Sequence, residues 1–441
     1  MMKYILLISI LFFQLNLVAN QADTKPQTIV MTDGEVDDHS SMIRFLLYTC
    51  DLDIKAIIET NSKWQREGHS KENWWENMLD AYDQVHSNLL AHNKDYPSAD
   101  YLRSISFLGD EDPEHLDTPR SNYYPGKKEY RDPSGWADTP GSERIVEILL
   151  EDSSEIIYIL AWGGGNTLSR ALYKLKKEHP EKYEQAAKRI TTHFISYQDG
   201  AGTYIEQFHP NVIMVVNHGF AGTWNYKSQT DTYDLIAREV KNGHGPLGAL
   251  YPQSYVSEGD SPSFFYCLPN GLRNYEHPTF GGWGGRYEPM ETNPTVFLDA
   301  YDGGSRLQSQ ARWVRDVNAD FMARIDWCVA SEFNQANHAP VLKVNTDINL
   351  KVKSGETFEL DVEGTEDPDG DLIDYYWWIY QEAGTFKGNF SVEYQEGHTF
   401  KAKAPEVDKT ETIHIIVEVS DFPAKNPTLK AYQRFVIEVK P

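Results

Sequence analysis

The segment QTIVMTDGEVDD, residues 27–38, decides the fold of this chain. Its β-branched, apolar half predicts a buried strand, and its acidic half predicts the turn that ends the strand. The apolar spacing of residues 41–48 indicates a helix, and residues 54–61 return to a strand that ends at Asn61. Strand, helix and strand in this order form a βαβ unit, so we expect a parallel sheet covered by helices.

The same alternation continues further along the chain. Residues 155–161 have the pattern of a strand, and the glycines at 163–165 turn it into a helix. Residues 193–197 and 212–216 predict two more buried strands. We therefore predict an open, mostly parallel α/β sheet with flanking helices over residues 25–335. Ligands of such sheets bind beyond the carboxyl ends of the strands.

The pattern changes near residue 337, after which apolar residues recur with period two, as in residues 413–419. Short alternating strands predict an all-β sandwich of the Ig or cadherin type over residues 338–441. Its turn DPDGD, residues 367–371, resembles the acidic turn of cadherin-like modules; it would hold Ca²⁺ or form a tight solvated turn. Trp377 and Trp378 are adjacent, so we do not expect both to be core, and the sandwich is a candidate carbohydrate-binding module.

The N-terminus predicts export. Lys3 precedes a short apolar run, residues 4–13, and no acidic residue occurs before Asp23. This pattern is typical of a cleaved signal peptide, which we place at residues 1–20, and the run is short for a membrane anchor. We expect a secreted or periplasmic protein with no transmembrane segment in the mature chain.

Composition limits the partners. A formal net charge of −25 repels phosphate backbones, so we expect no nucleic-acid partner. Aromatic residues make up 13% of the chain, enough both to fill a core and to stack on sugars. We therefore expect a carbohydrate or glycoside as the ligand. Three cysteines allow at most one disulfide bond, and the sequence leaves the oligomeric state open.

The acidic turn is the strongest chemical signal. Asp33, Glu35, Asp37 and Asp38 crowd the end of the first predicted strand, where they would repel one another unless a cation joined them. Oxygen ligands at this density suit Ca²⁺. In the alternative reading, Asp33 caps the following helix, while Asp37 and Asp38 favour its positive end. The turn by itself leaves both readings open.

This turn resembles the nucleoside-hydrolase signature that follows the first strand of that family. The resemblance implies that Asp33 is the general base and a Ca²⁺ ligand, and that Asp38 is a second Ca²⁺ ligand. It also implies that Asp37 and Asn61 contact the sugar. Asn166 lies near the position whose backbone carbonyl binds Ca²⁺ beside the substrate.

A closer resemblance is to exported, nucleoside-hydrolase-like proteins described as cellulose-binding, which also carry a C-terminal β-sandwich. Four further motifs carry it, namely WGGGNTL at 162–168, ISYQDGAG at 195–202, EGDSPSF at 258–264 and PTFGGWGGRY at 278–287. Two departures from the nucleoside-hydrolase pattern affect the surroundings of the base. Met31 replaces an Asp, and Gly34-Glu35 replaces a Pro-Gly pair.

These motifs add four candidate residues. Asp260 would complete the Ca²⁺ site or simply form a turn. Trp283 and Arg286 would offer a stacking face and a cationic donor to a sugar or uronate, or else belong to a structural loop. Asp199 is expected at the rim of the site, in contact with substrate. Three histidines lack metal-like spacing and are expected to be structural, namely His193, His209 and His218.

Two functions remain at this stage. The first is a secreted, glycan-acting hydrolase in which Asp33 takes a proton while Ca²⁺ assists cleavage of a glycosidic or N-glycosidic bond. The alternative is a non-catalytic protein that binds cellulose or another polysaccharide. The acidic residues favour the enzyme, whereas Met31 favours the binding protein.

Overall fold

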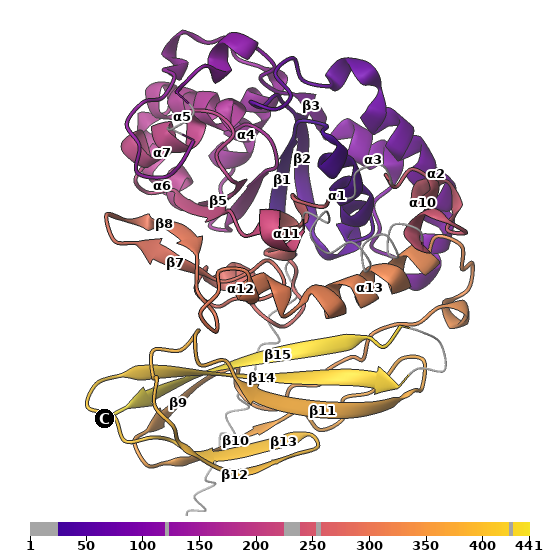
Figure 1. The fold of residues 1–441 in the computed structure, drawn as a ribbon, viewed down its shortest axis with the longest axis vertical. Helices are drawn as coiled ribbons and strands as arrows, with labels where there is room; N and C mark the ends of the chain where they lie inside the picture. Colours follow the sequence, from indigo (N-terminus) through magenta and orange to yellow (C-terminus); the bar gives the residue numbers. More distant parts are fainter. Residues whose placement is uncertain (1–24, 120–122, 225–238, 253–256, 423–426) are drawn as a thin grey trace, which may run out of the picture.

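The computed structural model describes residues 25–119, 123–224, 239–252, 257–422 and 427–441. The chain forms an α/β part and, after it, a smaller β-sandwich (Figure 1). The predicted signal peptide, residues 1–20, lies outside the described residues. Among the residues that are described, no helix is long and apolar enough to cross a membrane.

The α/β part contains one eight-stranded sheet in the order β3-β2-β1-β4-β5-β6-β8-β7. Every neighbouring pair is parallel except the edge pair β7 and β8, so the predicted open, mostly parallel sheet is confirmed. Its strands are β1 (Gln27–Thr32), β2 (Asp53–Glu59), β3 (Ser106–Leu108), β4 (Ile157–Ala161), β5 (Ile190–Ile195), β6 (Ile213–Asn217), β7 (Tyr287–Met290) and β8 (Asn293–Asp299).

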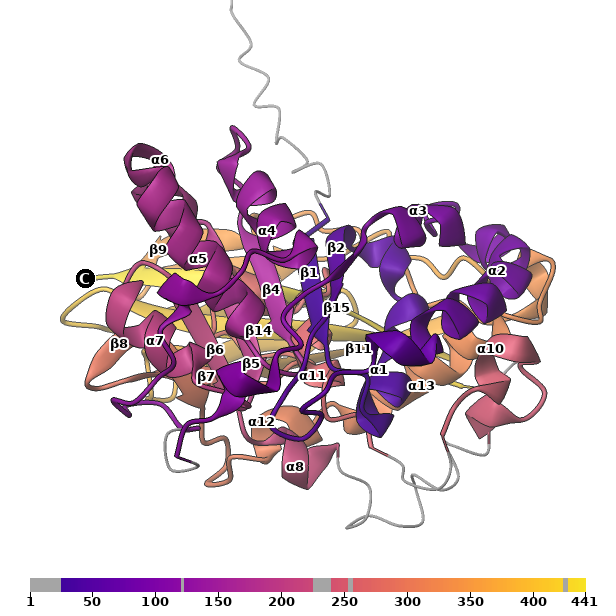
Figure 2. The ribbon, with the colours of Figure 1, turned by 90° about the horizontal axis from the view of Figure 1, so that it is seen from above.

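Helices cover both faces of this sheet (Figure 2). One face carries α1 (Val36–Leu46), α2 (Trp74–His92), α3 (Ala99–Ser104), α10 (Gly245–Ala249), α11 (Ser261–Phe265) and α13 (Val314–Asp326). The other face carries α4 (Pro140–Leu150), α5 (Asn166–Glu178), α6 (Pro180–Lys188) and α7 (Ala201–Phe208). The remaining helices are short: α8 (Phe220–Thr223), α12 (Gln308–Ala311), η1 (Thr49–Asp51), η2 (Ser70–Glu72), η3 (Pro113–Leu116), η5 (Pro133–Gly135), η7 (Asn274–Glu276) and η8 (Phe333–Gln335).

The two-sided covering explains why β1 is apolar without interruption. Val30 points into the core beneath α1 and α2, whereas Ile29 and Met31 point into the core beneath α4 and α5. A strand buried on both faces has no polar alternation. Its first polar side chains therefore come where the strand ends, at Thr32 and Asp33.

The sandwich consists of a three-stranded sheet, β10-β13-β12, and a four-stranded sheet, β11-β14-β15-β9. Its strands are β9 (Asn349–Lys353), β10 (Thr357–Asp361), β11 (Leu372–Ile379), β12 (Ser391–Glu396), β13 (Thr399–Lys403), β14 (Glu411–Phe422) and β15 (Lys430–Lys440). Inward-facing residues such as Leu360, Phe400 and Phe435 form its core, so the predicted sandwich is confirmed.

The four-stranded sheet of the sandwich packs its outer face against the α/β part. Ile416, Tyr380 and Tyr432 on this face belong to the same core as α1 and α13. We call this contact the junction. Trp377 and Trp378 point to opposite faces of the sheet, as predicted. Trp377 lies in the sandwich core. Trp378 is half-buried and packs against Trp313 of the α/β part, with ring centroids 6.0 Å apart. The two tryptophans therefore provide no open stacking platform.

The acidic turn at 367–371 holds the segment that leads into the sandwich. Asp367 Oδ1 accepts hydrogen bonds from the backbone N–H groups of Asp369 and Asp371, at 2.9 and 3.2 Å. Asp369 in turn accepts from the N–H of His338 at 2.8 Å.

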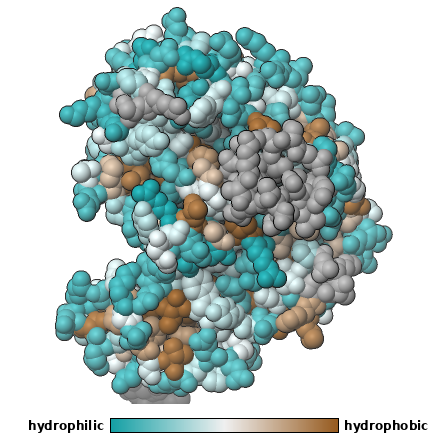
Figure 3. Space-filling view, viewed as in Figure 1, coloured by the Kyte–Doolittle hydropathy of each residue, from teal (hydrophilic) through white to brown (hydrophobic). Residues whose placement is uncertain are grey.

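In the space-filling view the surface is mostly hydrophilic, and a notch separates the two parts on one side (Figure 3).

Candidate functional site

The carboxyl ends of β1, β2 and β4 bring the predicted site residues together. Asp33 follows β1, Asn61 follows β2, and Gly163 and Gly164 follow β4. A Cβ on Gly163 would lie 2.6 Å from Cβ of Asp33, and one on Gly164 would lie 2.5 Å from the carbonyl oxygen of Asn61. Real Cβ atoms do not approach other atoms so closely. The three segments therefore meet only because these positions are glycine.

Three carboxylates converge at this edge. Asp37, Asp38 and Asp260 each place one carboxylate oxygen within 4.8 Å of the others. Asp38 and Asp260 are each only 2% exposed, whereas Asp37 reaches the solvent in part. Asp38 and Asp260, two of the four predicted metal ligands, therefore lie together in the structure. Asp37, for which the prediction is a contact with the sugar, lies with them.

Asp33 lies beside this group. Its backbone N–H donates to Oδ1 of Asp38 at 3.1 Å, and Thr32 Oγ1 donates to the same oxygen. Oδ2 of Asp33 and Oδ2 of Asp260 are buried and have no hydrogen-bond partner among the described atoms. We call Asp33, Asp37, Asp38 and Asp260 the acidic cluster.

Burial and mutual repulsion raise the pKa values of three of these carboxyl groups, Asp37, Asp38 and Asp260. Burial, followed by the charges of Asp33, Asp260 and Asp37, holds the pKa of Asp38 well above its usual range. The pKa of Asp260 is raised well above its usual range by burial and then by the charges of Asp37, Asp33 and Glu35. Burial and then Glu35 and Asp33 raise the pKa of Asp37 to about 7. Without a cation, these groups therefore keep their protons to a higher pH than an ordinary Asp does.

Two amide side chains at the same edge keep an acceptor open. Nδ2 of Asn61 donates to the carbonyl of Arg66 at 3.1 Å, and Nδ2 of Asn166 donates to the carbonyl of His115 at 3.2 Å. Oδ1 of each is buried without a partner among the described atoms. Buried amide oxygens are normally hydrogen-bonded. Both oxygens can therefore accept from a sugar hydroxyl or coordinate a hard cation.

Asp199 does not fit its predicted role as a substrate contact. It is 1% exposed, and its Oδ2 accepts from the N–H groups of Gly165 and Asn166 at 2.7 and 3.0 Å. Its Oδ1 accepts from the N–H of Ala201 at 2.9 Å, and burial raises its pKa to about 6. Asp199 thus binds the N-terminus of α5, where it orients Asn166.

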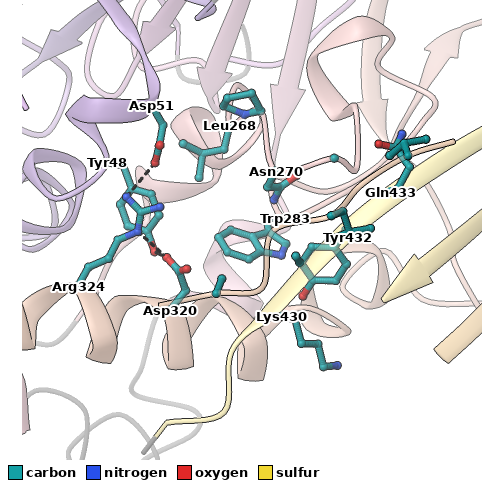
Figure 4. Close-up of a pocket in the computed structure, with 16 residues that line it drawn as sticks. Tyr48, Asp51, Leu268, Asn270, Trp283, Asp320, Arg324, Lys430, Tyr432 and Gln433 are labelled. Carbon is teal, nitrogen blue, oxygen red and sulfur yellow. Dashed lines mark hydrogen bonds and ion pairs between the residues drawn. The ribbon is translucent and has the colours of Figure 1, made fainter. Parts of the chain in front are cut away.

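Trp283 lies at the junction rather than at the acidic cluster, which corrects the expectation of a sugar-stacking face there. It is 4% exposed, and its ring meets Phe265 and Tyr432 edge-on, with centroids 6.3 and 6.1 Å apart. It lines a junction cavity of about 340 Å³, together with Tyr48, Asn270 and Tyr432 (Figure 4). Arg324, which also lines this cavity, pairs with Asp51 and Asp320, each at 2.8 Å.

Arg286 is also structural rather than ligand-facing. Its Nε donates to Asp302 at 2.7 Å, and the side chains are 3% and 0% exposed. A second nitrogen pairs with Glu288 at 2.9 Å. The glycine-rich motif therefore builds the junction, and its cation is neutralised within the protein.

The three histidines agree with the structural interpretation. His193 is 1% exposed and its Nε2 lies 3.1 Å from the hydroxyl of Tyr287, while burial lowers its pKa to about 3. His209 lies 2.7 Å from the hydroxyl of Tyr183, and burial again lowers its pKa to about 3. Burial also lowers the pKa of His218. All three are therefore neutral at physiological pH.

Contacts between the motifs were not predicted. The indole Nε1 of Trp162 donates to Oγ of Ser263 at 2.7 Å, and Nε2 of Gln198 donates to the carbonyl of Trp162. Glu258 pairs with Arg44 at 2.7 Å. The motifs themselves indicated that Trp162 and Glu258 matter, but no sequence signal marked Arg44, an arginine within a helix.

The family follows from a match to the α/β part. Residues 27–287 match the family described as "Cellulose-binding Sde182, nucleoside hydrolase-like domain". The chain belongs to this family. Residues 357–439 match "Cellulose-binding protein Sde0182, C-terminal domain", so both parts of the chain have a counterpart in Sde182-type proteins. This membership associates the chain with carbohydrate.

Solved structures support the same architecture. A nucleoside hydrolase-related protein from Saccharophagus degradans, described as associated with carbohydrate metabolism, is 28% identical, with a TM-score of 0.79. The match covers 95% of this Sde182-family chain and 100% of that protein.

Nucleoside hydrolases themselves are more distant. A plant nucleoside hydrolase is 11% identical with a TM-score of 0.38, covering 68% of this chain and 99% of that one. An inosine-guanosine nucleoside hydrolase is 13% identical with a TM-score of 0.35, covering 69% of this chain and 99% of that one. A comparison with curated proteins finds no match.

Proposed function

We propose that this protein is a secreted, Ca²⁺-assisted hydrolase that cleaves a glycosidic or N-glycosidic bond during polysaccharide degradation. The observation that carries the proposal is the acidic cluster. Its carboxylates converge at the carboxyl edge of a parallel sheet, and two of their oxygens are buried without partners among the described atoms. Such an arrangement is costly unless a cation or substrate completes it.

The donor set fits Ca²⁺. All candidate ligands are hard oxygens, from Asp37, Asp38 and Asp260, with Asp33 beside them and Asn166 at the same edge of the sheet. Ca²⁺ takes six to eight oxygen ligands in flexible geometry, so water and sugar hydroxyls would supply the remainder. A dication also removes the repulsion that raises the pKa values of these carboxyl groups.

Within this proposal, Asp33 acts as the general base. Its unpartnered Oδ2 would accept a proton from the attacking water as positive charge develops on the sugar. Asn61 would accept from a sugar hydroxyl at Oδ1, and Asp199 holds Asn166 in place. A bound Ca²⁺ supplies positive charge that anchors adjacent hydroxyls and lowers the pKa of water.

A second candidate function is polysaccharide binding without cleavage. Met31, which stands where nucleoside hydrolases have an acidic residue, is fully buried among Ile58 and Ile159. Asp33 therefore has no carboxylate behind it at that position. The description of the matching family as cellulose-binding also supports this candidate.

Export is the third element of the proposal. The basic start and short apolar run of residues 1–20 support a signal peptide and a secreted or periplasmic location. Outside the cell, an insoluble polysaccharide or a fragment of it is a more suitable ligand than a salvaged nucleoside.

The test compares the wild type with Asp38→Ala. Calorimetry measures Ca²⁺ binding, and assays on a panel of polysaccharides and glycosides, nucleosides included, measure released reducing sugar or free base. We expect the wild type to bind Ca²⁺ and to release product, and Asp38→Ala to do neither.

Asp361→Ala is the matched control. Another acidic group lies on the sandwich and consists of Asp361, Glu363 and His398. Removing the Asp361 carboxylate should leave Ca²⁺ binding at the acidic cluster unchanged. Undiminished Ca²⁺ binding by Asp38→Ala would remove the metal site from the proposal. Binding of the wild type to insoluble cellulose without turnover of any substrate would establish the second candidate.

A further inference from the structure

A fully buried ion pair connects the last turn of α1 to the segment that carries Asp260. Arg44, near the end of α1, and Glu258 are 2.7 Å apart, and both side chains are 0% exposed. The hydroxyl of Tyr251 donates to the other carboxylate oxygen of Glu258 at 2.5 Å. The guanidinium of Arg44 also lies 4.0 Å from the ring centroid of Phe321.

The pair joins the two segments that supply the cluster. Asp37 and Asp38 occupy the first turn of α1, and Arg44 lies in its last turn. Glu258 precedes Asp260 by two residues, and the turn between them is closed by a hydrogen bond from Ser261 N–H to the carbonyl of Glu258 at 3.1 Å. Glu258 points to Arg44 while Asp260 points to Asp37 and Asp38.

Arg44 is itself held in one orientation. Its nitrogens donate to the carbonyl of Val317 at 3.2 Å and to Oδ1 of Asn318 at 2.9 Å, both on α13. The guanidinium is planar and rigid, so partners on two sides fix the direction from which it meets Glu258. Helix α13 thereby sets the position of the segment that carries Asp260.

We infer that Arg44 and Glu258 are positioning residues that set the distance of Asp260 from Asp37 and Asp38, and with it the affinity for Ca²⁺. This inference rests on the proposed function, because it concerns the same metal. Neither side chain is a ligand in it. Groups that orient metal ligands from behind typically change metal affinity by about 10–100-fold when they are removed.

The structure offers a matched control for a role in stability alone. Arg286 and Asp302 form another buried ion pair, also at 2.7 Å, with side chains 3% and 0% exposed. That pair belongs to the junction. Glu258→Gln and Asp302→Asn each remove one carboxylate partner of a buried arginine, so both should lower the melting temperature in chelator.

The experiment measures Ca²⁺ affinity by calorimetry for the wild type and both variants, below their melting temperatures. We expect Glu258→Gln to bind Ca²⁺ at least about tenfold more weakly and Asp302→Asn to bind it as the wild type does. Arg44→Lys, which keeps the charge but not the planar fork, should weaken binding in the same direction. It also serves as the test if Glu258→Gln does not fold.

Each outcome separates the two claims. If the wild type binds no Ca²⁺, the proposed function fails. If the wild type binds Ca²⁺ and Glu258→Gln and Arg44→Lys bind it equally well, the positioning role is wrong while the metal site stands. Equal weakening by Asp302→Asn would also overturn the inference, because general destabilisation would then explain the loss.

Discussion

Buried charge is handled in opposite ways at the acidic cluster and at the junction. At the junction, Arg286 meets Asp302 at 2.7 Å and the hydroxyl of Tyr380 donates to the same carboxylate at 2.6 Å. At the cluster, three carboxylates lie together with Asp33 beside them, and oxygens of Asp33 and Asp260 have no partner among the described atoms. The charges of the junction are balanced within the protein, whereas those of the acidic cluster are not balanced by any described residue.

This difference distinguishes a structural motif from the candidate site within one chain. Both regions contain polar residues set among glycines, and both looked like candidate sites in the sequence. A buried charge with a counter-charge is stable without a ligand, whereas buried like charges without one destabilise the folded protein. Such destabilising groups occur more often at functional sites.

Breaking the junction pair should have the largest effect. Asp302→Asn leaves the buried guanidinium of Arg286 without its main counter-charge, so we expect the free energy of unfolding to fall by about 3–5 kcal/mol. Urea unfolding, followed by tryptophan fluorescence, measures the loss. A change below 1 kcal/mol would mean that the junction does not depend on this pair.

Changing the pH should affect the cluster in two opposite ways. The folded-state pKa of Asp37, raised to about 7 by burial and neighbouring charges, lies above the value of an unfolded Asp. Between about pH 4 and 7 the folded protein holds a proton on Asp37 that the unfolded chain has lost, so unfolding releases this proton. Rising pH favours the release, and the metal-free protein therefore loses stability over this window. Ca²⁺ affinity should increase by about tenfold per pH unit for each proton that binding releases, and Asp37 supplies one such proton over this window. Calorimetry in buffers of different ionisation enthalpy counts the released protons, and a pH-independent affinity would contradict the prediction.

Neutralising a cluster carboxylate should stabilise the metal-free protein. Asp38→Asn keeps an oxygen for the hydrogen bonds from Thr32 and Asp33 but removes one like charge. In chelator at pH 8 we expect the free energy of unfolding to increase by about 1 kcal/mol, opposite in sign to Asp302→Asn. Added Ca²⁺ should stabilise the wild type and not this variant. Destabilisation of the chelated variant would show that Asp38 is satisfied without a cation.

The exposed partner of the junction arginine should matter least. Glu288 pairs with Arg286 at 2.9 Å, but its side chain is 56% exposed, so solvent screens the interaction. We expect Glu288→Gln to lower the free energy of unfolding by less than about 1 kcal/mol in the same urea assay. A loss as large as that of Asp302→Asn would show that Asp302 is not the main counter-charge of Arg286.

Local pattern predicted most of the α/β part. The strands β1, β4, β5 and β6 were all expected from apolar runs, because a strand buried on both faces leaves a continuous signal. Their ends differ from the predicted ones; for example, β5 covers residues 190–195 where 193–197 was expected. The convergence of Asp38 with Asp260 was also expected, though from family resemblance and not from spacing. The antiparallel edge formed by β7 and β8 was not predicted, since nothing local tells a strand which neighbour it will pair with.

The site residues divide in the same way. Asp33 and Asn61 were predictable because they lie just after strands, and the ends of parallel strands meet at one edge. Asp38 was predictable because it lies in the first turn of the helix that follows the first strand. Asp199 also follows a strand, but its carboxylate turns inward to the N-terminus of α5. Trp283 and Arg286 lie in a motif as distinctive as the acidic turn, and they serve the junction instead. A distinctive motif therefore did not tell whether its residues face a ligand or hold the two parts of the chain together.

By itself, the sequence determined the order of the elements, the change from α/β to all-β near residue 337 and the acidic turn after the first strand. These depend on hydrophobic periodicity and on glycine, which act over a few residues. Only the tertiary structure decided which buried charges have partners. Arg44 meets Glu258, and Arg286 meets Asp302, through packing between segments distant in the chain, whereas the acidic cluster receives no such partner among the described residues. That remaining imbalance of charge is what marks the turn at 33–38 as the candidate site.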